Sequence, residues 1–145
     1  MLTVSIMRLD SALPLPEYAY PGDAGLDLRA AQDCFLKPQE RALIPTGLRM
    51  AIPDGYAGFV QSRSGAAARQ GLSLVNSPGL IDSQYRGEIM VIAINLDDKK
   101  PIEIHKGDRI AQLVILPIPQ VKLVEVATLD GTERSEKGFG SSGKA

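Results

Sequence analysis

The sequence contains very little of the chemistry that thiols and imidazoles supply. Among its 145 residues there is one cysteine, Cys34, and one histidine, His105. A single cysteine excludes a disulfide within the chain, and one cysteine with one histidine cannot form a structural zinc site. Any bound metal is therefore expected to be a hard ion held by oxygen atoms. We interpret Cys34 as a half-buried small hydrophobic side chain near a strand end rather than a reactive thiol.

Long apolar runs and an excess of charge of one sign are also missing. No apolar stretch approaches the roughly 20 residues that span a bilayer. Residues Met1–Asp10 lack the basic segment and apolar core of a signal peptide. The formal net charge is −1 and the lysines and arginines are dispersed, so no basic field favours nucleic acid or acidic membranes. We therefore expect a cytoplasmic protein that binds neither nucleic acid nor membranes.

What the sequence does contain is a series of short apolar runs separated by glycine and proline. The length suits one domain. Asp54-Gly55 predicts a tight hairpin. One short helix is expected at Ala66–Gln70, with Ser64 as its N-cap and Gly71 at its end. The expected strands are Leu43–Ile44, Leu48–Ile52, Tyr56–Val60, Leu72–Val75, Glu88–Leu96, Ile102–Ile104, Ile110–Leu116 and Val121–Val126.

Many short strands with one short helix indicate an all-β, jelly-roll-like distorted β-barrel. From Gly131 onward the sequence is rich in glycine and serine, carries charge, and has Phe139 as its only aromatic residue. Such a segment cannot bury enough apolar surface to become ordered by itself. We expect residues 1–130 to form the β-barrel domain and residues 131–145 to form a mobile C-terminal tail that closes over the active site.

Two segments have the composition of phosphate-binding sites. Arg63-Ser64-Gly65 places a guanidinium beside a helix N-terminus, which suits a phosphate; the alternative is an ordinary helix cap with a solvated arginine. Residues 138–144 match most of the pattern G-x-x-x-x-G-K, but Ala145 stands at the Ser/Thr position and no strand precedes them closely. A Walker site is therefore excluded. The glycines still permit backbone N–H groups to wrap a phosphate, and the alternative is a flexible chain end.

Two further segments carry polar groups between apolar strands. In Gly79–Glu88, Asp82 and Tyr85 lie in an expected hairpin, where the carboxylate suits a general base or, alternatively, an Asx-type turn. In Lys106–Gln112, Gln112 falls on an apolar strand. Because leaving a buried amide unpaired is costly, Gln112 requires a hydrogen-bonding partner in the protein or in a ligand.

Together these segments resemble the five sequence motifs of the dUTPase family. The matches run in order from about Asp23 to the C-terminus, and the third, with Ile-Asp…Tyr-Arg-Gly-Glu, is the most specific. Two departures are Ser62, where the family usually has proline, and Ser135-Glu136-Lys137, where glycines usually follow the arginine. The matching segments are Ala24–Leu28, Arg63–Gly65, Gly79–Glu88, Lys106–Gln112, and Arg134 with Gly138–Gly143.

The resemblance implies a jelly-roll homotrimer with three active sites at subunit interfaces. Such an enzyme hydrolyses dUTP to dUMP and pyrophosphate, which limits uracil incorporation into DNA and supplies dUMP for dTMP synthesis. By similarity, Asp82 activates a water for in-line attack on the α-phosphorus. A Mg²⁺ ion chelates the triphosphate, and Asp27 holds its water shell.

The resemblance also assigns the substrate contacts. Tyr85 is expected to pack under the deoxyribose, and Phe139 to stack on the uracil. Arg63, Ser64, Gly65 and Gln112 hold the phosphate chain, Asn76, Gly79, Leu80, Ile81 and Met90 surround the base, and Arg134, Ser141 and Ser142 close on the γ-phosphate; Gly140 also binds the substrate.

Two other functions remain open at this stage. The same fold serves dCTP deaminases, which use a glutamate as a proton shuttle, and Glu88 stands in the expected hairpin. The spacing of Asp82 and Tyr85 and the glycine-rich tail resemble the hydrolase more. Alternatively, the chain is a non-catalytic nucleotide-binding module that signals through a closing tail.

Overall fold

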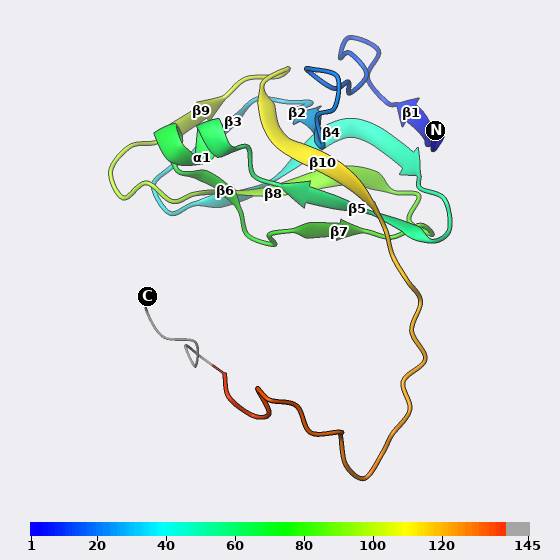
Figure 1. Cartoon of the computed structure of the whole chain (residues 1–145). Coiled ribbons are helices and arrows are strands. Elements are labelled where there is room, and N and C mark those ends of the chain that lie inside the picture. Colours follow the sequence, from blue (N-terminus) through cyan, green and yellow to red (C-terminus); the bar gives the residue numbers. More distant parts are fainter. Residues whose placement is uncertain (139–145) are drawn as a thin grey trace.

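The structure, a computed structural model, describes residues 1–138 and consists of two four-stranded β-sheets, a two-stranded ribbon and one short helix (Figure 1). Within these residues the strands are β1 (Ser5–Arg8), β2 (Leu26–Arg29), β3 (Cys34–Leu36), β4 (Arg41–Ala51), β5 (Tyr56–Gln61), β6 (Leu72–Leu74), β7 (Gly79–Ile81), β8 (Glu88–Asn95), β9 (Ile102–Ile104) and β10 (Arg109–Pro117), and the helix is α1 (Ser64–Gln70).

The strands pair antiparallel throughout. One four-stranded sheet has the order β1-β4-β8-β6, the other has the order β2-β10-β5-β7, and β3 pairs with β9 in a separate ribbon. The core lies between the two large sheets: Ile89 and Val91 of β8 are fully buried, as are Leu28 of β2 and Leu113 of β10. The all-β expectation is confirmed, and the two sheets remain open at their edges.

Strand β4 is continuous where the sequence predicted two separate runs. It passes through Pro45 and Gly47, and its pairing with β8 shifts between Pro45, opposite Met90, and Arg49, opposite Glu88. Gly47 has a φ of +70°. The extra residues form a bulge, and a bulge accommodates both a proline without an N–H group and a glycine with positive φ. Pro45 and Gly47 therefore bend the strand instead of ending it.

Both predicted hairpins are wrong. The turn at Asp54-Gly55 links β4 of one sheet to β5 of the other, and the segment after β7 links back from the second sheet to β8 of the first. Gly55 has a φ of +81°, as a tight turn requires. Turn residues specify where the chain reverses but not which strands then pair. The chain crosses between the sheets at these places.

The helix α1 begins one residue earlier than its predicted cap implies. Its N-cap is Arg63, whose side chain makes no capping hydrogen bond, and Ser64 is the first helical residue. Gly71 ends the helix with a φ of +69°, as predicted. Cys34 begins β3 and is half-buried, and burial raises the pKa of its thiol. This agrees with its interpretation as a packing residue.

After β10 the chain leaves the β-domain as an extended segment (Figure 1). Residues 119–138 are all exposed, and the strand expected at Val121–Val126 does not form within this chain. Its alternating pattern has no neighbouring strand edge to pair with in the same copy. Across residues 1–138, no helix has the length and apolar character needed to cross a membrane.

Candidate functional site

The first candidate site is an open pocket of about 470 Å³ where α1, β2 and β10 meet. Three arginines and two aspartates contribute to its wall. We call it the arginine pocket; its lining residues are Ala19, Tyr20, Asp23, Ala24, Gly25, Asp27, Arg63, Ser64, Gly65, Arg69, Arg109 and Gln112. The predicted phosphate residues from the second and fourth motifs and the predicted metal residue Asp27 are therefore brought together.

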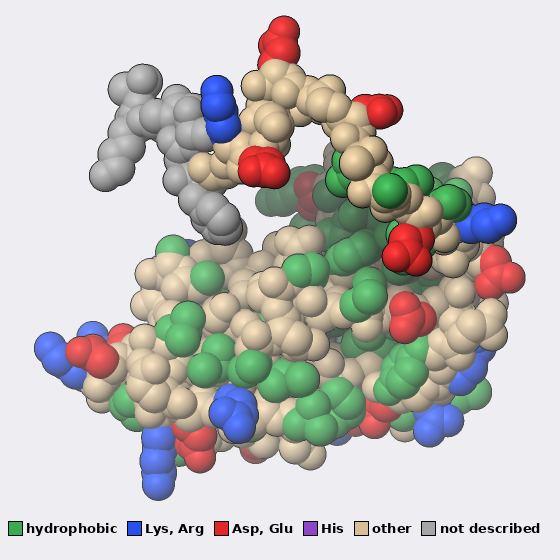
Figure 2. Space-filling view, turned by 90° about the horizontal axis from the view of Figure 1, so that it is seen from below, with side chains coloured by type: hydrophobic (Ala, Val, Ile, Leu, Met, Phe, Trp, Pro, Cys, Tyr) green, Lys and Arg blue, Asp and Glu red, His purple; other side chains and the backbone are tan. Residues whose placement is uncertain are grey.

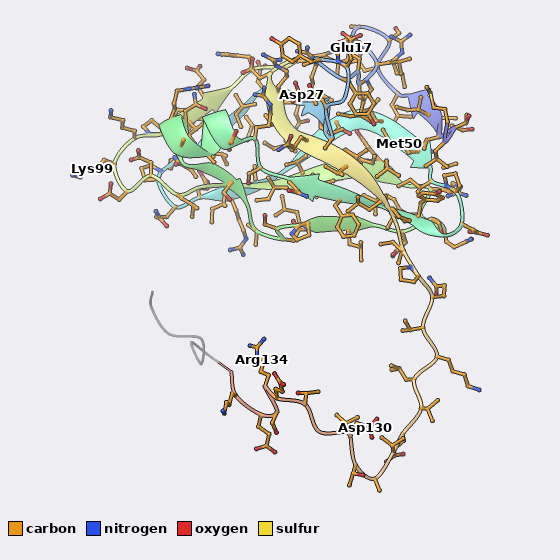
Figure 3. The ribbon with its side chains drawn as sticks, in the orientation of Figure 1. Glu17, Asp27, Met50, Lys99, Asp130 and Arg134 are labelled. Atoms are coloured by element: carbon orange, nitrogen blue, oxygen red, sulfur yellow. The ribbon has the colours of Figure 1, made fainter. Side chains whose placement is uncertain are left out.

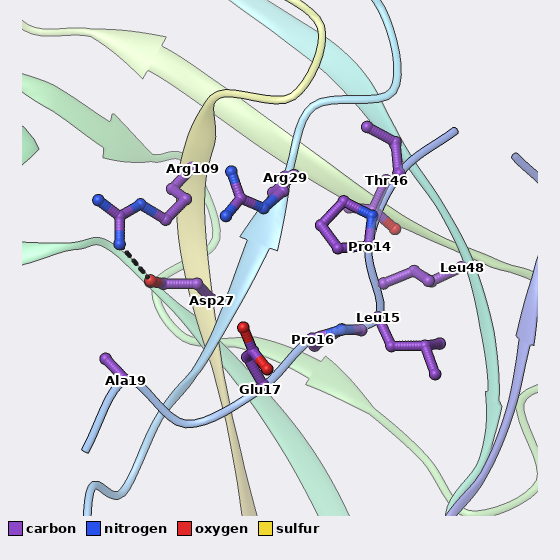
Figure 4. A pocket seen from close by; sticks show the side chains of 11 residues that line it. Pro14, Leu15, Pro16, Glu17, Ala19, Asp27, Arg29, Thr46, Leu48 and Arg109 are labelled. Carbon is purple, nitrogen blue, oxygen red and sulfur yellow. Dashed lines mark hydrogen bonds and ion pairs between the residues drawn. The ribbon is translucent and has the colours of Figure 1, made fainter. Parts of the chain in front are cut away.

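Asp27 lies between two arginines in this pocket. Arg63 Nε donates to Asp27 Oδ1 across 2.8 Å, and Arg109 Nη1 donates to Asp27 Oδ2 across 3.2 Å. Figure 4 shows the Arg109 contact at the rim of a smaller neighbouring cavity of about 80 Å³, which the segment 13–17 covers. Both carboxylate oxygens are thus engaged by guanidinium groups. Asp27 offsets only part of the positive charge of the arginines in this pocket. The remaining positive charge suits a polyanion.

Gln112 ties the start of α1 to the sheet. Its backbone pairs with Asp27 of β2 on one side and with Gln61 of β5 on the other. Its side-chain Nε2 donates to the Ser62 carbonyl across 2.9 Å, so the predicted need for a partner is confirmed and the partner is structural. A Cβ atom at Gly25 would lie 2.6 Å from Gln112 Oε1. A side chain at residue 25, just before β2, would therefore have to displace the end of the Gln112 side chain.

Arg69 and Arg109 were not predicted as site residues. Arg69 folds back along α1 onto Gly65, where an added Cβ would lie 2.9 Å from Arg69 Nη2. The i, i+4 spacing on a helix is the sequence signal for this contact. Arg109 and Gln112 are three apart and would face opposite sides of a regular strand. A register shift between Arg109 and Ala111 brings Arg109 and Gln112 to the same pocket. No feature of the sequence predicts that shift.

The second candidate site is a pocket of about 200 Å³ at the edge of β7 and β8. We call it the Asp82 pocket; its lining residues are Leu43, Leu80, Ile81, Asp82, Tyr85, Glu88, Met90 and Ile92. Asp82 follows β7, is exposed, and accepts a hydrogen bond from the Tyr85 N–H at its carbonyl, 3.1 Å away. The pocket has an apolar wall and the accessible carboxylate of Asp82. Five of its lining residues were predicted as site residues.

Asn76 and Gly79 lie just outside that pocket, Asn76 in the turn before β7 and Gly79 at the first position of β7. Asn76 is exposed and Gly79 is buried. The Asn76 amide nitrogen lies only 3.2 Å from where a Cβ of Gly79 would stand. The glycine therefore allows the amide to lie against the backbone beside the pocket.

The two pockets have no lining residue in common. Arg134 belongs to neither: it lies on the extended C-terminal segment, away from Asp27, and its Nε donates to the Lys137 carbonyl across 3.0 Å (Figure 3). Phe139, Gly140, Ser141 and Ser142 lie outside the described residues. One copy of the chain thus presents two separate pockets.

The chain offers few direct ligands for a metal ion. Within residues 1–138, no group of three or more His, Cys, Asp or Glu side chains could hold one. Asp27 supplies a single carboxylate beside the cationic wall of the arginine pocket. This donor set fits Mg²⁺ in the form in which it keeps most of its waters and is held by phosphate oxygens and one carboxylate.

Comparison with known proteins relates this arrangement to one family. A family model described as dUTPase matches residues 11–143. A deoxyuridine 5'-triphosphate nucleotidohydrolase of Streptomyces avermitilis is 53% identical over 98% of this chain and 81% of its own length. The enzyme of that name from Corynebacterium glutamicum is also 53% identical, over 99% of this chain and 97% of its own.

Solved structures agree. A mutant of the Staphylococcus bacteriophage 80alpha dUTPase with dUpNHpp superposes with a TM-score of 0.90 at 33% identity, covering 99% of this chain and 100% of that one. A mutant dUTPase from phage phi11 of S. aureus, described with a structural Mg(II) ion, has a TM-score of 0.80 at 29% identity, covering 88% and 98%. The jelly-roll expectation is thereby confirmed, and the chain belongs to the dUTPase family.

Proposed function

We propose that this chain hydrolyses dUTP to dUMP and pyrophosphate in the presence of Mg²⁺. The observation that carries the proposal is the division of its polar groups into two pockets. One has three arginines, and the other pairs the carboxylate of Asp82 with Tyr85 and an apolar wall. The first suits a triphosphate, and the second suits a sugar and a base next to the bond that breaks.

The arginine pocket would bind the phosphate chain. Arg63, held by Asp27 at 2.8 Å, already points into the pocket and can exchange its carboxylate partner for a phosphate oxygen. Backbone N–H groups of Ser64 and Gly65 begin α1 and add donors. Gln112 fixes this loop through the Ser62 carbonyl. Mg²⁺, when bound, neutralises charge on the triphosphate, and Asp27 would hold it through a water.

Asp82 would act as the general base. Its carboxylate is exposed at the end of β7 and accepts no hydrogen bond from residues 1–138. A water beside it would lose a proton to the carboxylate while its oxygen attacks the α-phosphorus. The bond from that phosphorus to the bridging oxygen breaks, and pyrophosphate leaves on the opposite side.

The Asp82 pocket would select a deoxynucleotide with a uracil base. Tyr85 would pack under the deoxyribose, where its ring leaves no room for a 2′-hydroxyl. Asn76 and the backbone around Gly79, Leu80, Ile81 and Met90 would surround the base, since polar readout rejects a wrong donor pattern strongly. The segment 131–145 would then close over the nucleotide, with Arg134, Gly140, Ser141 and Ser142 near the phosphates and Phe139 on the base.

We further propose that the working enzyme is a homotrimer in which different copies supply the two half-sites. Strand β8 is apolar on both faces, since Ile92 and Ile94 point away from the core that holds Val91. Leu43, Val75 and Leu80 are 50–58% exposed in the single chain. Apolar side chains spread over the underside of the β-domain, on the side of the C-terminal segment (Figure 2).

The C-terminal segment supports the same proposal. Five of its apolar residues are 56–90% exposed in one copy; they are Val121, Leu123, Val124, Val126 and Leu129. Copies of the same chain are the occupants that would cover such faces. Size-exclusion chromatography with light scattering tests this directly: the trimer mass is expected, and a monomer at micromolar concentration would refute it.

The deaminase alternative is less well supported. Glu88 Oε1 accepts a hydrogen bond from the Gly47 N–H at 2.8 Å, so one oxygen of the required proton shuttle has a structural partner. A panel of dNTPs and UTP with Mg²⁺ separates the functions. Pyrophosphate release from dUTP alone supports hydrolysis, ammonia from dCTP supports deamination, and binding without turnover supports a nucleotide-binding module. In a cell, the hydrolase would limit uracil incorporation into DNA and supply dUMP for dTMP synthesis in the cytoplasm.

A further inference from the structure

The side chain of Tyr85 leans over the backbone of Gly87. The phenol hydroxyl donates to the Glu88 carbonyl across 2.8 Å, which fixes the far end of the ring. A Cβ atom at Gly87 would lie 2.5 Å from Tyr85 Cζ and 2.9 Å from Cε2, and the hydroxyl oxygen would be nearer still. Real Cβ atoms essentially never come within 3.0 Å of another atom. The ring therefore occupies the space that any side chain at residue 87 needs.

The backbone itself does not require glycine at this position. The glycines with positive φ are Gly22, Gly47, Gly55, Gly71 and Gly107, and Gly87 is not among them. The usual reason for a glycine, a left-handed backbone conformation, therefore does not apply at residue 87. The contact with Tyr85 is thus the feature in residues 1–138 that excludes a side chain there.

The strand beneath the ring is held in place and cannot easily move aside. The carboxylate of Glu88 accepts the Gly47 N–H across 2.8 Å at the bulge of β4. Thr46 Oγ1 donates to the Ile89 carbonyl across 2.6 Å, and Thr46 is buried. Both hydrogen bonds tie the start of β8 to β4. The ring of Tyr85 is exposed and the strand is anchored, so a Cβ at residue 87 displaces the ring.

We propose that Gly87 is a positioning residue for sugar discrimination. It holds the Tyr85 ring flat against the backbone, in the orientation from which the ring excludes a 2′-hydroxyl. The proposal rests on the proposed dUTP hydrolysis and adds a residue that makes no contact with the substrate itself. It acts only through Tyr85.

The test compares kcat/KM for dUTP and UTP in the full-length chain. The proteins are the wild type, Gly87→Ala, Tyr85→Ala and the double variant. Gly87→Ala is expected to raise the UTP-to-dUTP ratio of kcat/KM by about tenfold, toward the ratio of Tyr85→Ala. The double variant is expected to match Tyr85→Ala, because the added methyl has no ring to displace. An unchanged ratio in Gly87→Ala, or additive effects in the double variant, would overturn the proposal.

Melting temperatures give a second readout that does not depend on activity. Gly87→Ala is expected to lower the melting temperature when residue 85 is tyrosine and to leave it unchanged when residue 85 is alanine. If Gly87→Ala fails to fold, a folded double variant still supports the contact, and an equally unfolded double variant contradicts it. A wild type without dUTP turnover refutes the proposed function, whereas a wild type with turnover and an unchanged Gly87→Ala ratio refutes the role of Gly87 alone.

Discussion

Arg63 Nε donates to Asp27 Oδ1 across 2.8 Å and joins the start of α1 to β2. The predicted phosphate ligand and the predicted metal residue are therefore each other's partners. Under the proposed function, a triphosphate in the arginine pocket would compete with Asp27 for Arg63. If Arg63 turned to a phosphate, Asp27 Oδ1 would be free to hold a Mg²⁺ ion through one of its waters. Substrate and metal binding are expected to reinforce each other through this exchange.

Asp27→Asn is expected to weaken the response to Mg²⁺ far more than it weakens the fold. The pair is about a quarter exposed, so its loss should change the free energy of unfolding by less than about 1 kcal/mol. The Mg²⁺ concentration for half-maximal rate should rise about tenfold. Titration calorimetry of a non-hydrolysable dUTP analogue, with and without Mg²⁺, gives a readout independent of turnover. Asp98→Asn, in an exposed turn far from the pocket, is the control. An unaltered Mg²⁺ dependence in Asp27→Asn would contradict the exchange.

Asp82→Asn is expected to abolish most turnover while leaving nucleotide binding intact. Asparagine keeps the size of the side chain and removes the proton acceptor, so kcat should fall about 10²–10⁴-fold. Single-turnover kinetics and the Kd of the analogue measure the two effects separately, and circular dichroism checks the fold. A variant that retains more than about a tenth of wild-type kcat would show that another group accepts the proton.

Several strands and the end of the helix were predictable because local sequence patterns determine them. Runs rich in isoleucine and free of glycine and proline predicted β8 and β9, and Gly71 was correctly predicted as the end of α1. The strand pairing was not predictable from local signals. Asp54-Gly55 predicts a reversal equally well whether the chain returns to the same sheet or crosses to the other. Short strands such as β1 and β7 carry too few residues for a recognisable alternation.

Some residues of the candidate site were likewise predictable from the sequence, and others were not. Arg63 and Asp82 were predicted as site residues because five segments resemble, in order, the motifs of the dUTPase family. Arg109 was missed as a pocket residue because a bulge in β10 decides which face it takes. The mutual pairing of Arg63 and Asp27 depends on a contact 36 residues apart in sequence, which no local pattern reveals.

Removing residues from Gly138 onward is expected to leave the β-domain folded and the activity strongly reduced. The chain that leads to the deleted residues, 131–138, is exposed and lies outside the core, so the melting temperature should barely change. The loss would come from contacts made only after substrate binds, when the segment orders over the nucleotide. Steady-state kinetics and thermal melts of the truncated protein test this prediction. A normal kcat/KM would show that the segment has no role in catalysis, and loss of folding would show that it has a structural role.

Asp97 is expected to stabilise the turn between β8 and β9 in a pH-dependent way. Its carboxylate accepts the N–H groups of Lys100 and Lys99, each across 2.8 Å, and these hydrogen bonds hold its pKa below the usual range. A lowered folded-state pKa gives stability that is present above the unfolded pKa of about 4 and lost as the pH falls through the folded value. Asp97→Asn should therefore melt below the wild type at pH 7, and the difference should vanish in acid.

The adjacent Asp98→Asn is the matched control for that experiment. Asp98 is exposed, and within residues 1–138 its side chain makes no hydrogen bond or ion pair. Its substitution should leave the melting temperature unchanged at both pH values. If the difference in melting temperature between wild type and Asp97→Asn persists at low pH, the effect does not come from the carboxylate charge.

The most direct test of the whole account is complementation between two inactive variants. Arg63→Ala disables the arginine pocket, and Asp82→Asn disables the other half-site. If dUTP is hydrolysed where halves from different copies meet, unfolding and refolding the two variants together should restore about a quarter of wild-type activity, because random mixing leaves that share of sites intact. Mixed oligomers that form, as verified by differential tagging, but release no pyrophosphate from dUTP would contradict the shared site.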